Sequence, residues 1–160
     1  MSIELVRVDD RLIHGQVVMG WTRSRGINTI LVADDETAKS KMQCQLMKMA
    51  TPPGVTPVFF TVDEAASKIL EGTYDNKKVM ILTKSCHQIA DLISKGVDIT
   101  EINLGNLRSG AGKVSIANMV YASEDEIKVW KELSDKGIKL YAQSVPSNPS
   151  TNINDALQKF

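Results

Sequence analysis

The residues best suited to chemistry lie near the start of the chain, where residues 9–16 read DDRLIHGQ. The imidazole of His14 is a good phosphoryl acceptor, because much of it is unprotonated at neutral pH. The guanidinium of Arg11 can hold two phosphate oxygens at once. Gly15 has no Cβ and lets the backbone approach a phosphate closely. This combination favours a phosphohistidine at His14.

The same residues also fit simpler roles. His14 could be a helix-capping or surface histidine, and Asp9 and Asp10 could form a turn or an N-cap. In the phosphohistidine hypothesis a carboxylate or a backbone carbonyl fixes the tautomer of His14, and Asp10 is the nearest candidate. His14 stands between a predicted strand and a predicted helix, whose N-terminus would offer free N–H groups and a positive dipole end to a phosphate.

The elements that position this segment alternate along the whole chain. The pattern predicts strands at 3–8, 29–33, 56–61, 79–83, 101–104 and 138–142, with a further strand near 114–116. It predicts helices at 15–25, 36–49, 63–70, 85–95, 123–136 and 154–159, two of them opened by capping boxes at 85–88 and 123–126.

This alternation indicates an α/β fold, with an open, mostly parallel twisted sheet, helices on both faces and a single domain over residues 1–160. In such sheets ligands bind outside the carboxyl ends of the strands. The loops at 9–14, 34–35, 84–87 and 105–113 therefore become the candidate site.

Four segments carry a resemblance to a known family. Residues 6–17, VRVDDRLIHGQV, resemble the active-site signature of the IIB component of the mannose/fructose/sorbose family of bacterial sugar phosphotransferase systems. Weaker matches follow in the right order: VADD at 32–35, NLGNLR at 103–108 and QSVP at 143–146. Leu107 stands where the family pattern has Met, which is a conservative apolar exchange. The resemblance covers essentially the whole chain.

The resemblance implies a transferase that works through a phosphohistidine. A IIA protein or domain would phosphorylate His14, which would pass the group to a sugar of the mannose, fructose, sorbose or N-acetylgalactosamine class entering through membrane IIC and IID subunits. The chain would be cytoplasmic and peripherally associated with that transporter, without cofactor or metal. Around His14, the implied phosphate-supporting residues are Asp10, Arg11, Gly15 and Gln16, and candidate loop or partner contacts are Asp35, Lys84 and Arg108.

Composition narrows the possible classes of protein further. Lys plus Arg equals Asp plus Glu, at 19 each, which argues against non-specific nucleic-acid binding. The sequence has no apolar run of transmembrane length, and its first residues do not resemble a signal peptide. Cys44 and Cys86 are far apart and read as reduced thiols. The two cysteines and two histidines share no short zinc-binding spacing.

The glycine-rich stretch at 105–113 invites a nucleotide-binding interpretation, but it lacks the spacing of the Walker A motif. It also fails the dinucleotide-binding motif, because its glycines lead into the expected strand at 114–116 rather than into a helix. We interpret it as a loop over the site or as a plain connection. His87 is interpreted as a structural residue or a neighbour of the site. The remaining alternative classes are a binding module that holds an anion or a partner at the same loop without turnover, and a nucleotide-dependent oxidoreductase, whose fingerprint is missing. Core roles are expected for Met42, Met47, Met49, Trp21 and Trp130.

Overall fold

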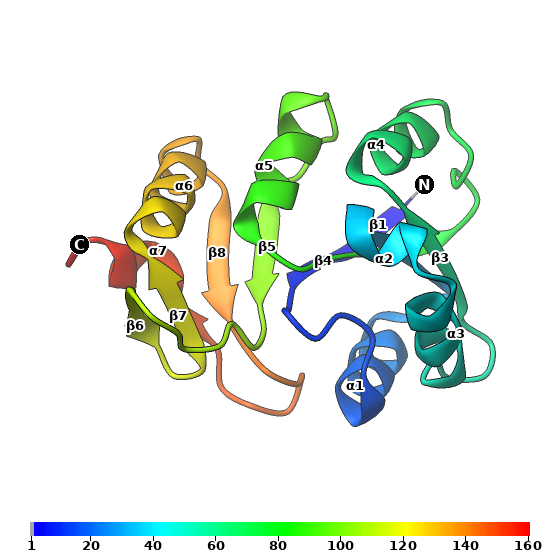
Figure 1. Cartoon of the computed structure of the whole chain (residues 1–160), viewed down its shortest axis with the longest axis horizontal. Coiled ribbons are helices and arrows are strands. Elements are labelled where there is room, and N and C mark those ends of the chain that lie inside the picture. The colour runs from blue at the N-terminus through cyan, green and yellow to red at the C-terminus, as the bar shows by residue number, and fades with distance from the viewer. Residues whose placement is uncertain (1) are drawn as a thin grey trace.

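The computed structural model describes residues 2–160, and its centre is a seven-stranded sheet in the order β3-β2-β4-β1-β5-β8-β9 (Figure 1). The neighbouring strands pair in parallel, except that β9 runs antiparallel to β8. The strands are β1 (Ser2–Val8), β2 (Thr29–Ala33), β3 (Thr56–Phe60), β4 (Lys78–Thr83), β5 (Glu101–Leu104), β8 (Lys139–Ala142) and β9 (Thr151–Asn152). The predicted mostly parallel sheet is confirmed.

Helices cover both faces of this sheet (Figure 1). One core cluster lies beneath α1 (Gly15–Arg25), with Met47 of α3 (Lys41–Met49) packed against it. The opposite cluster is larger and includes residues of α4 (Val62–Leu70), α5 (Cys86–Ser94), α6 (Glu124–Asp135) and α7 (Ile153–Leu157). Consecutive residues of the central strands are mostly apolar, and alternate side chains of a strand point to opposite sides of a sheet, so both faces are apolar.

Two elements were not predicted from the sequence. A separate two-stranded antiparallel ribbon joins β6 (Lys113–Ala117), which was anticipated, to β7 (Val120–Ser123), which was not. The two-residue strand β9 was also missed. Both are short, with four and two residues, and their pairing partners rather than their own sequence pattern define them.

The predicted helix at 36–49 is wrong as a single element. The structure has α2 (Asp35–Lys39) and then α3, with an extended residue, Ser40, between them. The Ser40 hydroxyl accepts a hydrogen bond from the backbone N–H of Gln43 and caps α3. A serine that satisfies a free helix donor in this way starts a new helix instead of continuing the old one.

The expected core role also fails for two methionines of α3. Met42 and Met49 are each 75% exposed, whereas Met47 is half-buried against the core below α1. The two tryptophans are core residues as predicted, since Trp21 and Trp130 are both 1% exposed. The break at Ser40 sets the rotation of α3 and leaves one of its apolar stripes in solvent.

The topology brings the predicted loops to one edge. β1 lies between β4 and β5, so the ends of these parallel strands are neighbours. The backbone N–H of Asp9 donates to the Thr83 carbonyl, and the N–H of Asp10 donates to the Asn106 carbonyl, both at 3.0 Å. The loop that carries His14 is thereby joined to the loops after β4 and β5.

Candidate phosphoryl-transfer site

His14 is the N-cap residue of α1 and stands in a strained turn. Leu12 has a φ of 56° and Gly15 a φ of 41°, a left-handed conformation that is unusual for leucine and ordinary for glycine. Leu12 holds this conformation because its side chain is buried at 1% exposure. The turn places His14 directly before α1, where its side chain is 24% exposed and makes no capping hydrogen bond to the helix.

Two groups contact the imidazole. Nδ1 lies 2.8 Å from the backbone carbonyl oxygen of Leu12, which accepts a hydrogen bond from that nitrogen when it is protonated. Nε2 lies 3.9 Å from Oδ2 of Asp9 and, among the described residues, is a buried atom with no hydrogen-bond partner. The Leu12 carbonyl therefore favours the tautomer that leaves a lone pair on the other ring nitrogen.

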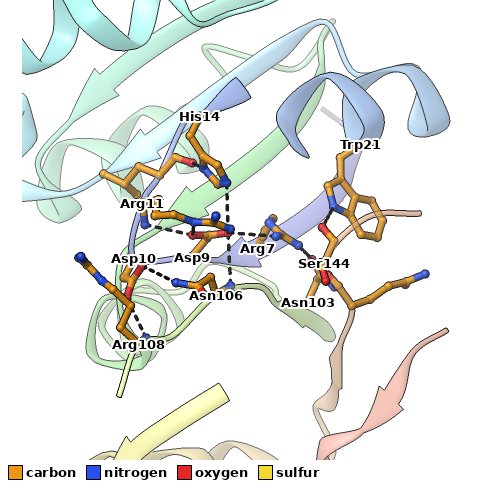
Figure 2. A network of polar contacts seen from close by, with 12 residues as sticks. Arg7, Asp9, Asp10, Arg11, His14, Trp21, Asn103, Asn106, Arg108 and Ser144 are labelled. Carbon is orange, nitrogen blue, oxygen red and sulfur yellow. Dashed lines mark hydrogen bonds and ion pairs between the residues drawn. The ribbon is translucent and has the colours of Figure 1, made fainter. Parts of the chain in front are cut away.

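The hub of the site is the fully buried carboxylate of Asp9 (Figure 2). Its Oδ1 accepts from the backbone N–H and the Nε of Arg11 at 3.0 and 3.2 Å, and its Oδ2 accepts from Arg7 at 3.0 Å. Burial alone would raise the pKa of Asp9, but the Arg11 hydrogen bonds and the charges of Arg7 and His14 bring the pKa below its ordinary value. Asp9 is thus an ionised anchor between two arginines.

Arg7 is the least expected residue of the site, because it is an arginine with 1% exposure on a central strand. Its guanidinium donates to Asn103 Oδ1 and, at 2.9 Å, to the Gln143 carbonyl, and it stacks over Trp21 at 5.6 Å. Burial lowers the pKa of Arg7 and the Asp9 charge partly restores it. An arginine stays protonated in proteins, so Arg7 is a fixed positive charge.

Gly105, which follows β5, leaves the space that this pair occupies. A Cβ at Gly105 would lie 2.6 Å from Oδ2 of Asp9, and it would overlap the guanidinium of Arg7. The glycine is therefore required by close approach rather than by its backbone angles.

Asp10 points away from His14 and joins the neighbouring loop (Figure 2). Its Oδ2 accepts from the backbone N–H and the Nε of Arg108 at 2.9 and 3.0 Å, and its Oδ1 accepts from Asn106 at 3.2 Å. The expectation that Asp10 fixes the His14 tautomer is therefore wrong. The Leu12 carbonyl oxygen and the Asp9 carboxylate lie beside the two ring nitrogens of His14 instead. Asp10 faces the loop after β5, where its backbone N–H donates to the Asn106 carbonyl.

The sequence predicts His14, Arg11 and Gly15 as site residues, but it assigns no role to Arg7 or Asn103 and leaves Asp9 as a turn or N-cap residue. A signal was present, because Arg7 stands between the apolar Val6 and Val8, and a buried charge requires a partner. Gln16, the next residue of the motif, is exposed at the start of α1.

The three candidate contact residues Asp35, Lys84 and Arg108 all line a polar cavity of about 830 Å³ at the same sheet edge. Asp35 accepts a hydrogen bond from the Val62 backbone N–H at 2.9 Å, so part of its role is structural. His87 is not in contact with His14: its Nε2 lies 3.4 Å from Asp125 of α6. Its assignment as a structural residue fits this position.

Two further absences hold for residues 2–160. No group of three or more His, Cys, Asp or Glu side chains is arranged to hold a metal ion. No helix is long and apolar enough to cross a membrane. Of the two free thiols, Cys86 is buried, and burial together with nearby Glu126 raises its pKa to about 12, so it stays protonated.

The arrangement defines a class before any comparison is made. An imidazole, two arginines on one buried carboxylate and a helix N-terminus meet at the carboxyl edge of a doubly wound sheet, and the two guanidinium groups outnumber the carboxylate they share. Such a site suits an anionic group that is bound or transferred.

Comparison with known proteins then gives the family. Residues 3–160 match the family described as PTS system sorbose subfamily IIB component. The sorbose-specific EIIB component of Lacticaseibacillus casei is 33% identical over 96% of this chain and 93% of its own length. The IIBSor domain of the sorbose permease of Klebsiella pneumoniae, a crystal structure, superposes with a TM-score of 0.93 at 30% identity and covers 99% of this chain and 98% of that chain.

The chain therefore belongs to the sorbose-subfamily IIB components of the sugar phosphotransferase system. It is also 33% identical to the mannose-specific EIIAB component of Escherichia coli K12, where the match includes all of this chain and 50% of that protein. The chain thus spans about half the length of these mannose-specific relatives.

Proposed function

We propose that this protein carries a phosphoryl group on His14, which it receives from a IIA protein or domain and delivers to a sugar. The observation that carries the proposal is the position of His14 at the N-terminus of α1, within 4 Å of an Asp9 carboxylate that also holds Arg11. An unpartnered imidazole nitrogen, a partly exposed guanidinium and a helix N-terminus supply the positioning and charge stabilisation that phosphoryl transfer needs.

In the first step the lone pair of the unprotonated His14 nitrogen attacks the phosphorus of the donor's phosphohistidine. The donor's N–P bond breaks and its electron pair returns to the donor ring. Before the ring moves, the Leu12 carbonyl holds the proton on the other His14 nitrogen. Because the unprotonated nitrogen is buried and faces Asp9 in this structure, the ring must rotate to present it to the donor.

Arg11 supplies the charge for the bound phosphoryl group. Its side chain is 39% exposed, whereas the other arginine on Asp9, Arg7, is buried. Arg11 can therefore move from Asp9 toward a dianion on His14, while Arg7 continues to neutralise Asp9. Without Arg7, the Asp9 charge would repel the incoming phosphoryl group.

In the second step a sugar hydroxyl attacks the phosphorus of phospho-His14. The N–P bond breaks, the hydroxyl proton is released, and His14 regains its lone pair. The sugar belongs to the mannose, fructose, sorbose or N-acetylgalactosamine class, and membrane IIC and IID subunits present it to a cytoplasmic IIB chain. The named relatives, which include sorbose- and mannose-specific components, support this substrate class.

The experiment uses the intact mass of the protein after incubation with a phosphorylated IIA donor. The wild type is expected to gain one phosphoryl mass and to lose it when the membrane subunits and sugar are added. His14→Gln should fold and gain nothing, while His87→Gln, the matched control at the other histidine, should behave like the wild type. Phosphorylation of folded His14→Gln at the normal rate would reject the proposal. A wild type that binds the donor without a gain in mass would instead identify a binding module.

A further inference from the structure

The α1 and α3 region of the sheet has an unusual charge distribution. Residues 11–33 contain α1, residues 37–62 contain α3, and neither stretch includes a single Asp or Glu. Their charged side chains are all cationic: Arg11, Arg23, Arg25, Lys39, Lys41 and Lys48. Because the whole chain has zero formal net charge, the remaining segments hold the balancing excess of carboxylates. The two cationic stretches are separated along the chain by Asp34, Asp35 and Glu36, of which Asp35 and Glu36 are exposed in α2.

Helix α3 adds exposed apolar surface to this cationic region. Met42, Leu46 and Met49 follow one another at helical spacing and are 75%, 59% and 75% exposed. No residue of α3 is fully buried. Lys41 and Lys48 are exposed on the same helix, and Lys39 is exposed just before it. We call the three apolar residues with these three lysines the α3 surface.

We propose that the α3 surface binds anionic lipid headgroups, with the apolar residues entering the headgroup boundary and the lysines lying over lipid phosphates. Apolar side chains flanked by lysines are the pattern of helices that lie on a membrane surface. A second copy of this chain fits poorly, because its lysines would meet lysines. The cytoplasmic loops of membrane proteins fit poorly as well, because they carry an excess of Lys and Arg.

The small size of the α3 surface sets the expected affinity. Three apolar side chains and three lysines give weak, reversible binding rather than a stable anchor. Each lysine near an anionic surface strengthens binding about fivefold, so the three together contribute roughly a hundredfold. The attraction should weaken as salt screens the charges. Such binding would concentrate the chain at the membrane without any contact to His14.

Flotation of the full chain with lipid vesicles tests the proposal. We expect recovery with vesicles in which about one third of the phosphatidylcholine is replaced by phosphatidylglycerol, and little recovery with phosphatidylcholine alone. K39Q/K41Q/K48Q should lose roughly a hundredfold in affinity. M42Q/L46Q/M49Q should also bind more weakly, and both variants should keep the wild-type unfolding transition because these side chains are exposed.

Matched controls test whether the location of the replaced side chains on the α3 surface matters, or only their number and type. K128Q/K136Q/K159Q removes three exposed lysines outside the α3 surface and should bind like the wild type. Leu70→Gln removes an exposed apolar side chain of α4 and should also leave binding unchanged. The lipid proposal adds a membrane contact to the proposed phosphoryl carrier, but it does not depend on phosphoryl transfer at His14. His14→Gln should therefore float with the vesicles like the wild type.

Three results would overturn the lipid proposal. The wild type could ignore phosphatidylglycerol vesicles, the control lysine variant could lose as much affinity as K39Q/K41Q/K48Q, or M42Q/L46Q/M49Q could float normally. If the wild type ignores vesicles and the α3 variants slow phosphoryl transfer from the donor in a lipid-free assay, the α3 surface belongs to a protein partner. None of these results bears on whether His14 accepts a phosphoryl group.

Discussion

At the scale of single residues, Asp9 is the point where the stability and the proposed chemistry of the site meet. It is fully buried, bonded to Arg7 and Arg11, and 3.9 Å from His14. Buried ion pairs are costly to assemble, and removing one partner is strongly destabilising because it leaves an uncompensated buried charge. The two arginines then have separate roles, because one is buried and the other is accessible.

The role of Arg11 is tested by Arg11→Lys. Lysine keeps the charge but loses the planar fork, so we expect the rate of phosphoryl transfer to fall about ten- to a hundredfold. The unfolding midpoint should change little, since Arg11 is partly exposed. Arg23→Lys on the exposed side of α1 is the control. Equal transfer rates for Arg11→Lys and the wild type would make Arg11 an ordinary surface charge.

The Arg7–Asp9 pair predicts a pH dependence of stability. Because the pKa of Asp9 is lower in the folded state than the ordinary value of 3.8, its ionised form favours folding above that pH. This contribution should disappear as the pH falls below 3.8 toward the folded-state pKa. Asp9→Asn should lower the free energy of unfolding at neutral pH by about 3–5 kcal/mol, because it leaves Arg7 buried without its partner.

Denaturant unfolding of Asp9→Asn and the wild type at neutral and acid pH measures this contribution. The difference between the two proteins should shrink at acid pH, where the wild-type carboxylate is protonated as well. Asp155→Asn, which changes an exposed carboxylate of α7, is the control and should show no such pattern. A difference that stays constant with pH would mean that the charge of Asp9 does not stabilise the fold.

At the scale of elements, local sequence signals predicted most of the fold. The limits of α1, β2 and β5 agree with the sequence prediction, because glycine, apolar runs and β-branched residues mark them clearly. The break at Ser40 was missed, since one side-chain hydrogen bond to Gln43 outweighs the continuous helical pattern. The exposure of Met42 and Met49 follows from that break.

The sequence could predict the candidate site only where its residues lie close together along the chain. His14, Arg11 and Asp9 lie within one loop, and the sequence brings them together. Arg7 and Asn103 are 96 residues apart, and Arg7 and Gln143 are 136 residues apart, so only the parallel arrangement of β1, β5 and β8 makes them neighbours. The hydrophobic periodicity of one strand cannot predict a contact between residues of three strands.

The close packing of β1 against the end of β5 is tested by Gly105→Ala. Its Cβ would overlap the Arg7–Asp9 pair, so we expect a loss of about 1–3 kcal/mol in the free energy of unfolding and a slower phosphoryl transfer. Gly20→Ala in α1, whose Cβ would meet Pro146 at 3.4 Å, is the control and should be close to neutral. Wild-type stability in Gly105→Ala would show that the pair moves freely.

At the scale of the whole molecule, a donor must meet His14 at the carboxyl edge of the sheet. Arg108 lies at this edge, where its side chain is 72% exposed and bonded to Asp10. Since the chain has no net charge, local charges must guide association.

Arg108→Glu should therefore slow donor association several-fold, and more strongly at low salt, where charges are less screened. Stopped-flow association rates measured over a range of salt concentrations check this, with Lys136→Glu at the exposed end of α6 as the control. An association rate of Arg108→Glu equal to that of Lys136→Glu at every salt concentration would remove Arg108 from the docking surface.

Mapping the phosphoryl group to a tryptic peptide tests the central claim most directly. Trypsin divides the only two histidines of the chain between the peptides 12–23 and 85–95. After incubation with a phosphorylated donor and digestion at mildly alkaline pH, where a phosphoramidate survives, the added mass should lie in 12–23 and vanish after brief acid treatment. A label in 85–95, or an acid-stable label in any peptide, would contradict a phosphohistidine at His14.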